Sequence, residues 1–202
     1  MSLRCGIIGL PNVGKSTLFN ALTSSNVPTE NYPFCTIDPH VGVVKLPDKR
    51  LNFLKEIYNP NAVTYSTVEF TDIAGLVEGA SKGEGLGNQF LGQIRQVNTI
   101  IHVVRCFKDD KITHVSGNVN PINDVEIIET ELLISDIQTL EKQFHKLEKL
   151  ARSGDKTDQI NYSLIQSLLD HCNNGKKVKT FNTNNEERKI VRNLNLLTNK
   201  PI

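Results

Sequence analysis

The stretch Gly9-Leu10-Pro11-Asn12-Val13-Gly14-Lys15-Ser16 decides the fold of this chain. Its spacing is G-x-x-x-x-G-K-[ST], in which glycines let the backbone wrap closely around phosphates with N–H groups turned inward. The lysine then reaches β- and γ-phosphate oxygens, and the serine hydroxyl can bind Mg²⁺. An expected apolar strand over 3–8 precedes the motif and an expected helix over 17–24 follows it. We expect a phosphate-binding loop whose contacts come from Asn12, Val13, Gly14, Lys15, Ser16 and Thr17, with Lys15 also catalytic.

A second motif, which contains an acidic residue, lies about sixty residues further along the chain. Asp72 ends the apolar run 67–72, and Gly75 follows three residues later in a D-x-x-G arrangement typical of GTPase-like proteins with this loop. We expect Asp72 to hold Mg²⁺ through a water and the Gly75 N–H to bond the γ-phosphate. Thr36, between the two motifs, is predicted to complete the Mg²⁺ shell, the alternative being a solvated loop threonine.

Short apolar runs alternate with helical stretches in the first part of the chain. The runs 41–46, 67–72 and 97–104 read as further strands beside the first one. Alternation of this kind is typical of βαβ units and a mostly parallel sheet flanked by helices. The expected fold class is therefore α/β.

The pattern changes after Pro121, where a long amphipathic helix is expected with Asp124 as its N-cap. Apolar side chains recur at 4-3-4-3-4 spacing, which is a heptad seam: Leu133, Ile137, Leu140, Phe144, Leu147 and Ala151. A polar turn over 153–156 leads to a second apolar series, Ile160, Leu164, Leu168 and Cys172. We expect an inserted antiparallel coiled-coil hairpin, the alternative being ordinary core helices.

These patterns predict two domains. Residues 1–123 form the nucleotide-binding core, 124–185 the helical insertion, and 186–202 return to the core, with a further helix over 186–197. The final residues read as the approach to a strand, so we expect the chain to stop before a base-reading motif. The glycine-rich stretch 79–92 is expected to be mobile rather than a stiff helix.

Composition limits the classes of function. The 202 residues include 23 basic and 22 acidic ones, for a net charge of +1, so the whole chain is no strongly basic nucleic-acid binder. No apolar run approaches the roughly 18 residues that span a bilayer, and the N-terminus has no secretory signal pattern. Four cysteines without a CxxC pair favour reduced thiols in a cytoplasmic protein, and the histidines do not cluster with them as zinc ligands would.

Several stretches together resemble the Obg-like ATPase (YchF) family of P-loop NTPases, in its N-terminal part. Besides the first loop these are 33–39, Asp72-Ile73-Ala74-Gly75-Leu76-Val77, 83–88 and Ile112-Thr113-His114-Val115-Ser116-Gly117. The resemblance covers nearly the whole chain, including the hairpin, and it implies binding and hydrolysis of ATP. The guanine-reading pattern N/T-K-x-D fails at 199–202, because Ile202 stands where Asp is required. A GTPase of the same fold, or a nucleotide-controlled binding module with incidental hydrolysis, stays open.

The resemblance also implies further contacts and partners. Phe107 matches an aromatic residue near the adenine, the alternative being a core phenylalanine, and Asn12 matches a position that helps to hold K⁺ beside the phosphates. Ribosomes or other translation components are the implied partners. RNA contact is also open through a basic stretch, the alternative being a solvated face: Lys176, Lys177, Lys179, Arg188, Lys189 and Arg192.

The residue that orients the attacking water is the open question of the mechanism. Leu76 follows D-x-x-G at the position where many GTPases have a glutamine, and a leucine cannot hydrogen-bond water, so slow intrinsic turnover is expected. His114, in the polar loop 108–120, is our candidate replacement, because a neutral imidazole can orient a water or accept a proton near pH 7. The alternative is an ordinary surface-loop histidine.

Overall fold

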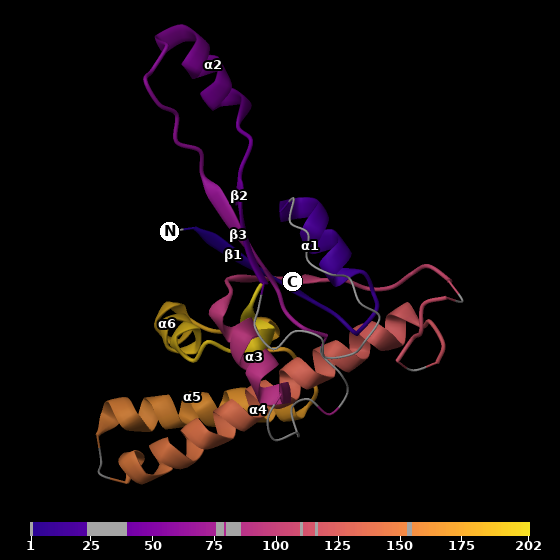
Figure 1. Cartoon of the computed structure of the whole chain (residues 1–202). Coiled ribbons are helices and arrows are strands. Elements are labelled where there is room, and N and C mark those ends of the chain that lie inside the picture. Colours follow the sequence, from indigo (N-terminus) through magenta and orange to yellow (C-terminus); the bar gives the residue numbers. More distant parts are fainter. Residues whose placement is uncertain are drawn as a thin grey trace. The chain divides into compact units, whose positions relative to one another are not determined.

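The computed structural model describes residues 2–23, 40–75, 79, 86–109, 111–115, 117–152 and 155–202. The chain forms two compact units (Figure 1). The first consists of Met1–Gly75, Val97–Val119 and Ile202, and the second of Leu76–Gln96 and Asn120–Pro201. Among the described residues, no helix combines the length and apolar character needed to cross a membrane.

The first unit contains a four-stranded sheet. Its strands are β1 (Leu3–Ile8), β2 (His40–Lys45), β3 (Thr67–Asp72) and β4 (Thr99–His102), in the order β2-β3-β1-β4. β1 pairs in parallel with β3 and β4, and β2 pairs antiparallel with β3. The central strand β1 is buried from its third residue onward, as its apolar sequence requires. The expected mostly parallel sheet is confirmed, with β2 as the antiparallel exception at the edge.

The described residues of this unit form two helices. Helix α1 (Lys15–Thr23) starts two residues earlier than predicted and buries Phe19. It lies so close to β2 that a Cβ at Gly42 would be 2.3 Å from Cγ2 of Thr23. Helix α2 (Lys49–Tyr58) connects β2 to β3, buries none of its residues and was not predicted. Its signal was present, because the Asp48 carboxylate caps the N-terminus by accepting a hydrogen bond from the Arg50 N–H.

Helix α3 (Leu86–Gln96) corrects one expectation. The glycines of 79–92 led us to expect no stiff helix there, yet α3 contains Gly87 and Gly92. Phe90, Leu91 and Ile94 on this helix are all buried. Burying three such side chains contributes several kcal/mol, which outweighs a cost of about 1 kcal/mol for each glycine.

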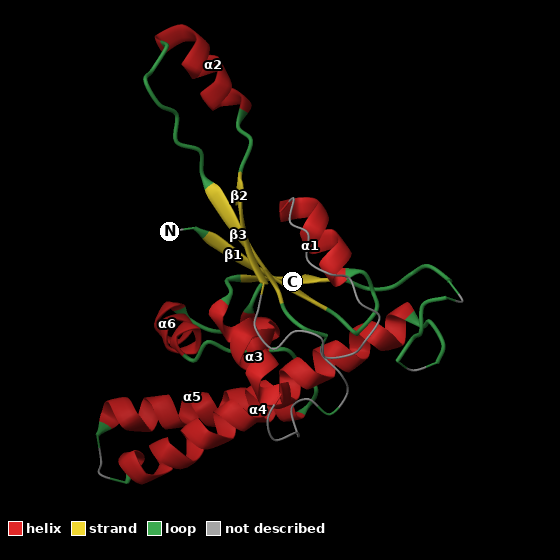
Figure 2. Cartoon of the chain, viewed as in Figure 1, coloured by secondary structure: helices red, strands yellow, loops and turns green. Residues whose placement is uncertain are grey.

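Two long helices dominate the second unit. Helix α4 (Pro121–Ala151) and helix α5 (Lys156–Asn173) run side by side in opposite directions (Figure 2). Helix α4 is capped by the Asn120 side chain, not by Asp124 as expected, because Pro121 suits the first helical position and Asp124 falls in the first turn. The seam is largely as predicted, since Leu140, Leu164, Leu168 and Cys172 are buried together.

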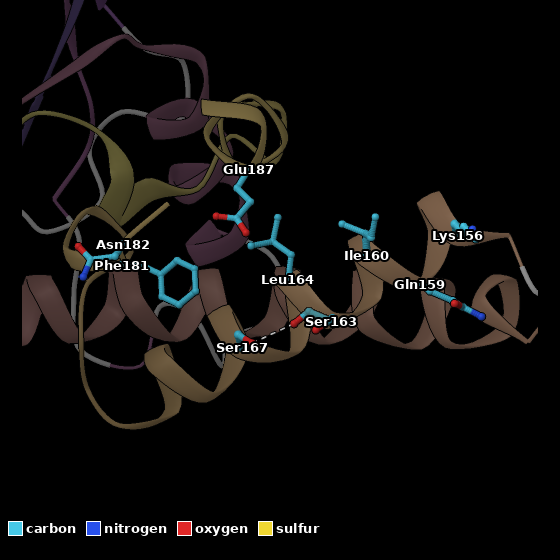
Figure 3. A pocket seen from close by; sticks show the side chains of 9 residues that line it. All are labelled: Lys156, Gln159, Ile160, Ser163, Leu164, Ser167, Phe181, Asn182 and Glu187. Carbon is cyan, nitrogen blue, oxygen red and sulfur yellow. Dashed lines mark hydrogen bonds between the residues drawn. The ribbon is translucent and has the colours of Figure 1, made fainter. Parts of the chain in front are cut away.

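Ile160 is the exception to the predicted seam. It is 62% exposed and lines a groove of about 600 Å³ with Leu164 and Phe181 (Figure 3). Lys156 and Glu187 also line this groove. The heptad pattern identified the face of α5 but not where its contact with α4 ends.

The end of the chain packs within the second unit as short elements. They are the 3-10 helix η1 (Val178–Thr180), α6 (Asn185–Asn193) and the 3-10 helix η2 (Leu197–Asn199), so the helix predicted over 186–197 ends early. The buried Asp136 carboxylate of α4 accepts hydrogen bonds from the N–H groups of Leu197 and Thr198 at 2.7 and 2.8 Å. Lys200 donates to the Arg95 carbonyl and to Oδ1 of Asn195, so it has a structural role here.

Candidate functional site

The loop between β1 and α1 has the backbone that its sequence predicts. Gly9 and Gly14 have positive φ values of 154° and 101°, and Asn12 lies in the left-handed region at 60°. A Cβ at Gly9 would be 2.3 Å from the Val103 carbonyl oxygen, so no other residue fits there. Val13 is buried and Thr17, in the first turn of α1, is exposed. The loop is therefore shaped as a concave turn at the N-terminus of a helix.

Lys15 is the buried cation of this loop. Its side chain is 7% exposed, and Nζ donates a hydrogen bond of 2.8 Å to the Leu10 carbonyl. Burial lowers the pKa of Lys15 to about 8, and the nearby Asp72 carboxylate opposes that decrease. A desolvated ammonium group is stabilised when an anion binds beside it.

Ser16 and Asp72 meet across the loop, as predicted from two distant motifs. Ser16 Oγ donates to Asp72 Oδ2 at 2.7 Å, and parallel pairing places Asp72 opposite Ile7 of β1. Burial raises the pKa of Asp72, while the Ser16 hydrogen bond and the charges of Lys15 and His40 oppose that rise. The second carboxylate oxygen, Oδ1, is buried and has no hydrogen-bond partner among the described residues. A hydroxyl beside a half-satisfied carboxylate is a donor set that fits Mg²⁺ with its waters.

Gly75 also lies against the loop. A Cβ there would be 3.0 Å from the backbone nitrogen of Pro11, so the D-x-x-G segment reaches the phosphate loop as expected. Thr36 and Leu76 lie outside the described residues. No group of three or more potential His, Cys, Asp or Glu ligands occurs in the described part of the chain, so the Ser–Asp pair is the metal-site candidate.

The segment after β4 runs back to the same loop. Asn12 Nδ2 donates to the Thr113 carbonyl at 3.1 Å, which holds the segment beside the phosphate loop. His114 follows directly and is 6% exposed, so it is not an ordinary surface-loop histidine. Phe107 is 47% exposed, which excludes the alternative of a core phenylalanine.

Sequence reasoning missed Arg105. This residue follows the apolar run 97–104 and is 2% exposed, which makes it the largest fully buried side chain described. Its guanidinium donates to three backbone carbonyls of the same segment, those of Phe107, Asp109 and Ile112. The available signal was a charged residue directly continuing a buried strand, where a hydrophobic side chain is the usual choice.

Comparison with known proteins agrees with this geometry. The family model described as 50S ribosome-binding GTPase matches residues 4–147. The ribosome-binding ATPase YchF of Bacillus subtilis is 52% identical over 202 residues, and that of Escherichia coli O157:H7 is 51% identical over 201 residues. Each alignment covers 100% of this chain and 55% of the relative. The chain thus spans about half the length of the curated relatives it matches.

A solved structure shares the fold. The structure of the Schizosaccharomyces pombe YchF GTPase superimposes with a TM-score of 0.78 at 38% identity. The match covers 99% of this chain and 55% of that one. The arrangement of sheet, loop and long helices described above is therefore that of a known P-loop fold.

Proposed function

Because the chain belongs to the P-loop NTPase family described as 50S ribosome-binding GTPases, in its YchF branch, we propose that it binds and hydrolyses ATP with Mg²⁺. We further propose that it acts in the cytoplasm as a regulatory switch on the ribosome or another translation component. The activity and partners named for its longer relatives support this proposal. We propose 1–123 together with 186–202 as the nucleotide-binding domain and 124–185 as the inserted helical hairpin, although residues 186–201 pack within the second compact unit.

One observation carries the proposal: Ser16 Oγ lies 2.7 Å from Asp72 Oδ2, beside the buried Asp72 Oδ1 that lacks a partner. The Ser16 hydrogen bond stabilises one oxygen of the carboxylate, but the second oxygen is buried and unsatisfied, which is unfavourable for the fold by itself. Mg²⁺ with its waters, bound beside a phosphate chain in the loop, would give that oxygen a partner. Ser16, Asp72 and Thr36 are the residues that we propose as its protein ligands, Asp72 through a water.

The residues of the loop supply binding and charge stabilisation. Lys15 exchanges its bond to the Leu10 carbonyl for β- and γ-phosphate oxygens, and the amides of 12–17 face the phosphates. Mg²⁺, when bound, adds positive charge to the same oxygens. The Gly75 N–H bonds the γ-phosphate. His114 orients the attacking water, and its burial beside the Asn12–Thr113 contact supports this role.

Recognition of the base is assigned to the segment that follows β4. We assign an adenine contact to Phe107, whose half-exposed ring is available for stacking. Direct competition between ATP and GTP for the intact protein tests the base: preference for ATP supports the ATPase, and preference for GTP supports a GTPase of the same fold.

Ribosome dependence tests the switch. Turnover that rises when ribosomes are added supports a regulated ATPase. Slow turnover that ribosomes leave unchanged, with ribosome binding in only one nucleotide state, supports a binding module with incidental hydrolysis. RNA contact through 176–192 is part of this proposal, since Lys176, Lys179, Arg188, Lys189 and Arg192 are exposed, whereas Lys177 pairs with Glu129.

A potassium ion is the second cation that we propose. Asn12 lies in the left-handed turn of the loop and donates Nδ2 to the Thr113 carbonyl, so its Oδ1 is the atom that would hold the ion. K⁺ held there adds positive charge where an arginine would otherwise act. Faster turnover in K⁺ than in Na⁺ supports this role, and identical rates argue against it.

A further inference from the structure

Arg105 presents an unusual arrangement for a buried charge. Nε donates to the Phe107 carbonyl at 3.2 Å, Nη2 to that of Asp109 at 3.0 Å and Nη1 to that of Ile112 at 3.1 Å. The guanidinium carbon lies 4.8 Å from the centre of the Phe107 ring. All three hydrogen bonds described for this guanidinium therefore go to main-chain oxygens, and the charge is stabilised by carbonyl dipoles and an aromatic ring.

These bonds determine the shape of one segment. The three carbonyls lie between residues 107 and 112, and the described residues of this segment form no helix or strand. One backbone hydrogen bond, from the Ile112 N–H to the Asp109 carbonyl, closes a turn within it. A single planar guanidinium with five donors in a fixed fork can fasten all three, which a lysine amine cannot do. Arg105 thus adds three side-chain hydrogen bonds to the single backbone bond of this turn.

The residues on both sides of the braced segment contact the phosphate loop. Before it, the Val103 carbonyl would lie 2.3 Å from a Cβ at Gly9. After it, the Thr113 carbonyl accepts a hydrogen bond from the Asn12 side chain at 3.1 Å. Thr113 directly follows Ile112, the last residue that Arg105 holds. Losing the hydrogen bond from Arg105 to the Ile112 carbonyl should therefore displace the neighbouring Thr113 carbonyl, which accepts the hydrogen bond from Asn12.

We propose that Arg105 is a positioning residue of the nucleotide site, which holds the Thr113 carbonyl against Asn12 and so keeps the phosphate loop in its binding shape. This inference rests on the proposed function. Arg105 acts through the segment and not by touching the phosphates, because its guanidinium is already bonded to three carbonyls.

A double-mutant cycle in the intact protein tests this coupling. The variants are Arg105→Ala, Asn12→Gly and their combination, with Mg–ATP affinity measured by calorimetry at fixed K⁺. Glycine is used at position 12 because it keeps the positive φ. We expect each single variant to weaken affinity about tenfold and the double variant to be no weaker than the worse single one. Arg152→Ala is the matched control, since Arg152 is exposed and forms an ion pair with Glu148 one turn earlier in α4.

The outcomes separate positioning from mere support of the fold. An arginine that only stabilises the protein lowers its melting temperature without changing the affinity of the folded protein. The inference is overturned if Arg105→Ala binds Mg–ATP as tightly as the parent. It is also overturned if the two single effects multiply, so that the double variant binds about a hundredfold more weakly. If Arg105→Ala does not fold, Arg105→Lys takes its place in the cycle, and the same two criteria apply. The parent is titrated first: absence of nucleotide binding there overturns the proposed function and this inference with it.

Discussion

At the scale of single residues, the site is built from groups that are costly until a ligand arrives. The Lys15 ammonium is nearly buried with a pKa of about 8, and Asp72 is a buried carboxylate whose pKa burial raises. Each loses the hydration that favours its charged form. In a magnesium-bound triphosphate, the phosphates would supply negative charge to Lys15 and the metal positive charge to Asp72. These interactions would replace the lost hydration. Sites of this kind exchange stability for function.

This exchange predicts the effect of Lys15→Met. The variant should bind nucleotide at least about a hundredfold more weakly, because the triphosphate no longer has the Lys15 ammonium group as its partner. Without nucleotide it should be more stable than the parent, by about 1–3 kcal/mol at pH 7, since a desolvated charge is gone. Urea unfolding and ATP titration measure the two quantities. Lys142→Met on the exposed face of α4 should change neither one, and a less stable Lys15→Met protein would contradict the argument.

His114 is the residue on which turnover should depend. His114→Ala is expected to lower the ATP turnover of the intact protein at least about tenfold, because a water-orienting group contributes to the rate of the chemical step. Affinity for ATP should stay within about twofold, since the imidazole does not hold the ground-state nucleotide. Single-turnover assays and equilibrium titration separate the two. His145→Ala, at an exposed position on α4, is the control; equal turnover in the His114 variant and the parent removes His114 from the mechanism.

At the scale of elements, periodicity was a good guide where burial sets the structure. The strand Leu3–Ile8 and the seam around Leu140 follow directly from apolar spacing, and both are as predicted. The meeting of Ser16 with Asp72 could also be predicted, because two motifs at the carboxyl ends of neighbouring parallel strands converge.

The errors arose where tertiary contacts outweigh local preference. Helix α3 forms despite two glycines because Phe90 and Ile94 are buried. Helix α2 has no buried residue and so gave no strong periodic signal. Arg105 was missed although a charged residue continues a buried strand there, because that signal does not reveal that three backbone carbonyls converge on the side chain. Contacts made by the main chain leave little trace in residue types.

The seam between α4 and α5 gives a prediction at this scale. Leu140 is completely buried there, so Leu140→Ala should lower the free energy of unfolding by about 2–5 kcal/mol through lost contacts and a cavity. Ile160 has a similar side chain on α5 but is 62% exposed. Ile160→Ala should therefore change stability by less than about 0.5 kcal/mol. Chemical denaturation of both variants measures the difference, and equal losses would contradict the observed packing.

At the scale of the whole molecule, each compact unit has its own framework. In the first, the phosphate loop, Asp72 and the segment braced by Arg105 lie together at the carboxyl ends of the parallel strands. In the second, Asp136 of α4 fastens the end of the chain through the N–H groups of Leu197 and Thr198. Nucleotide chemistry is thus assigned to the first unit, and the long helices of the second offer surface for a partner.

The central claim is that the loop of Gly9–Ser16 binds a triphosphate together with magnesium held at Ser16 and Asp72. Calorimetric titration of the intact protein with ATP, in Mg²⁺ and in EDTA, for the parent and for Asp72→Asn, tests it most directly. The account predicts that Mg²⁺ tightens binding to the parent at least about tenfold and that Asp72→Asn loses most of this gain. A parent that binds no nucleoside triphosphate, or that binds ATP equally well in EDTA, would contradict it.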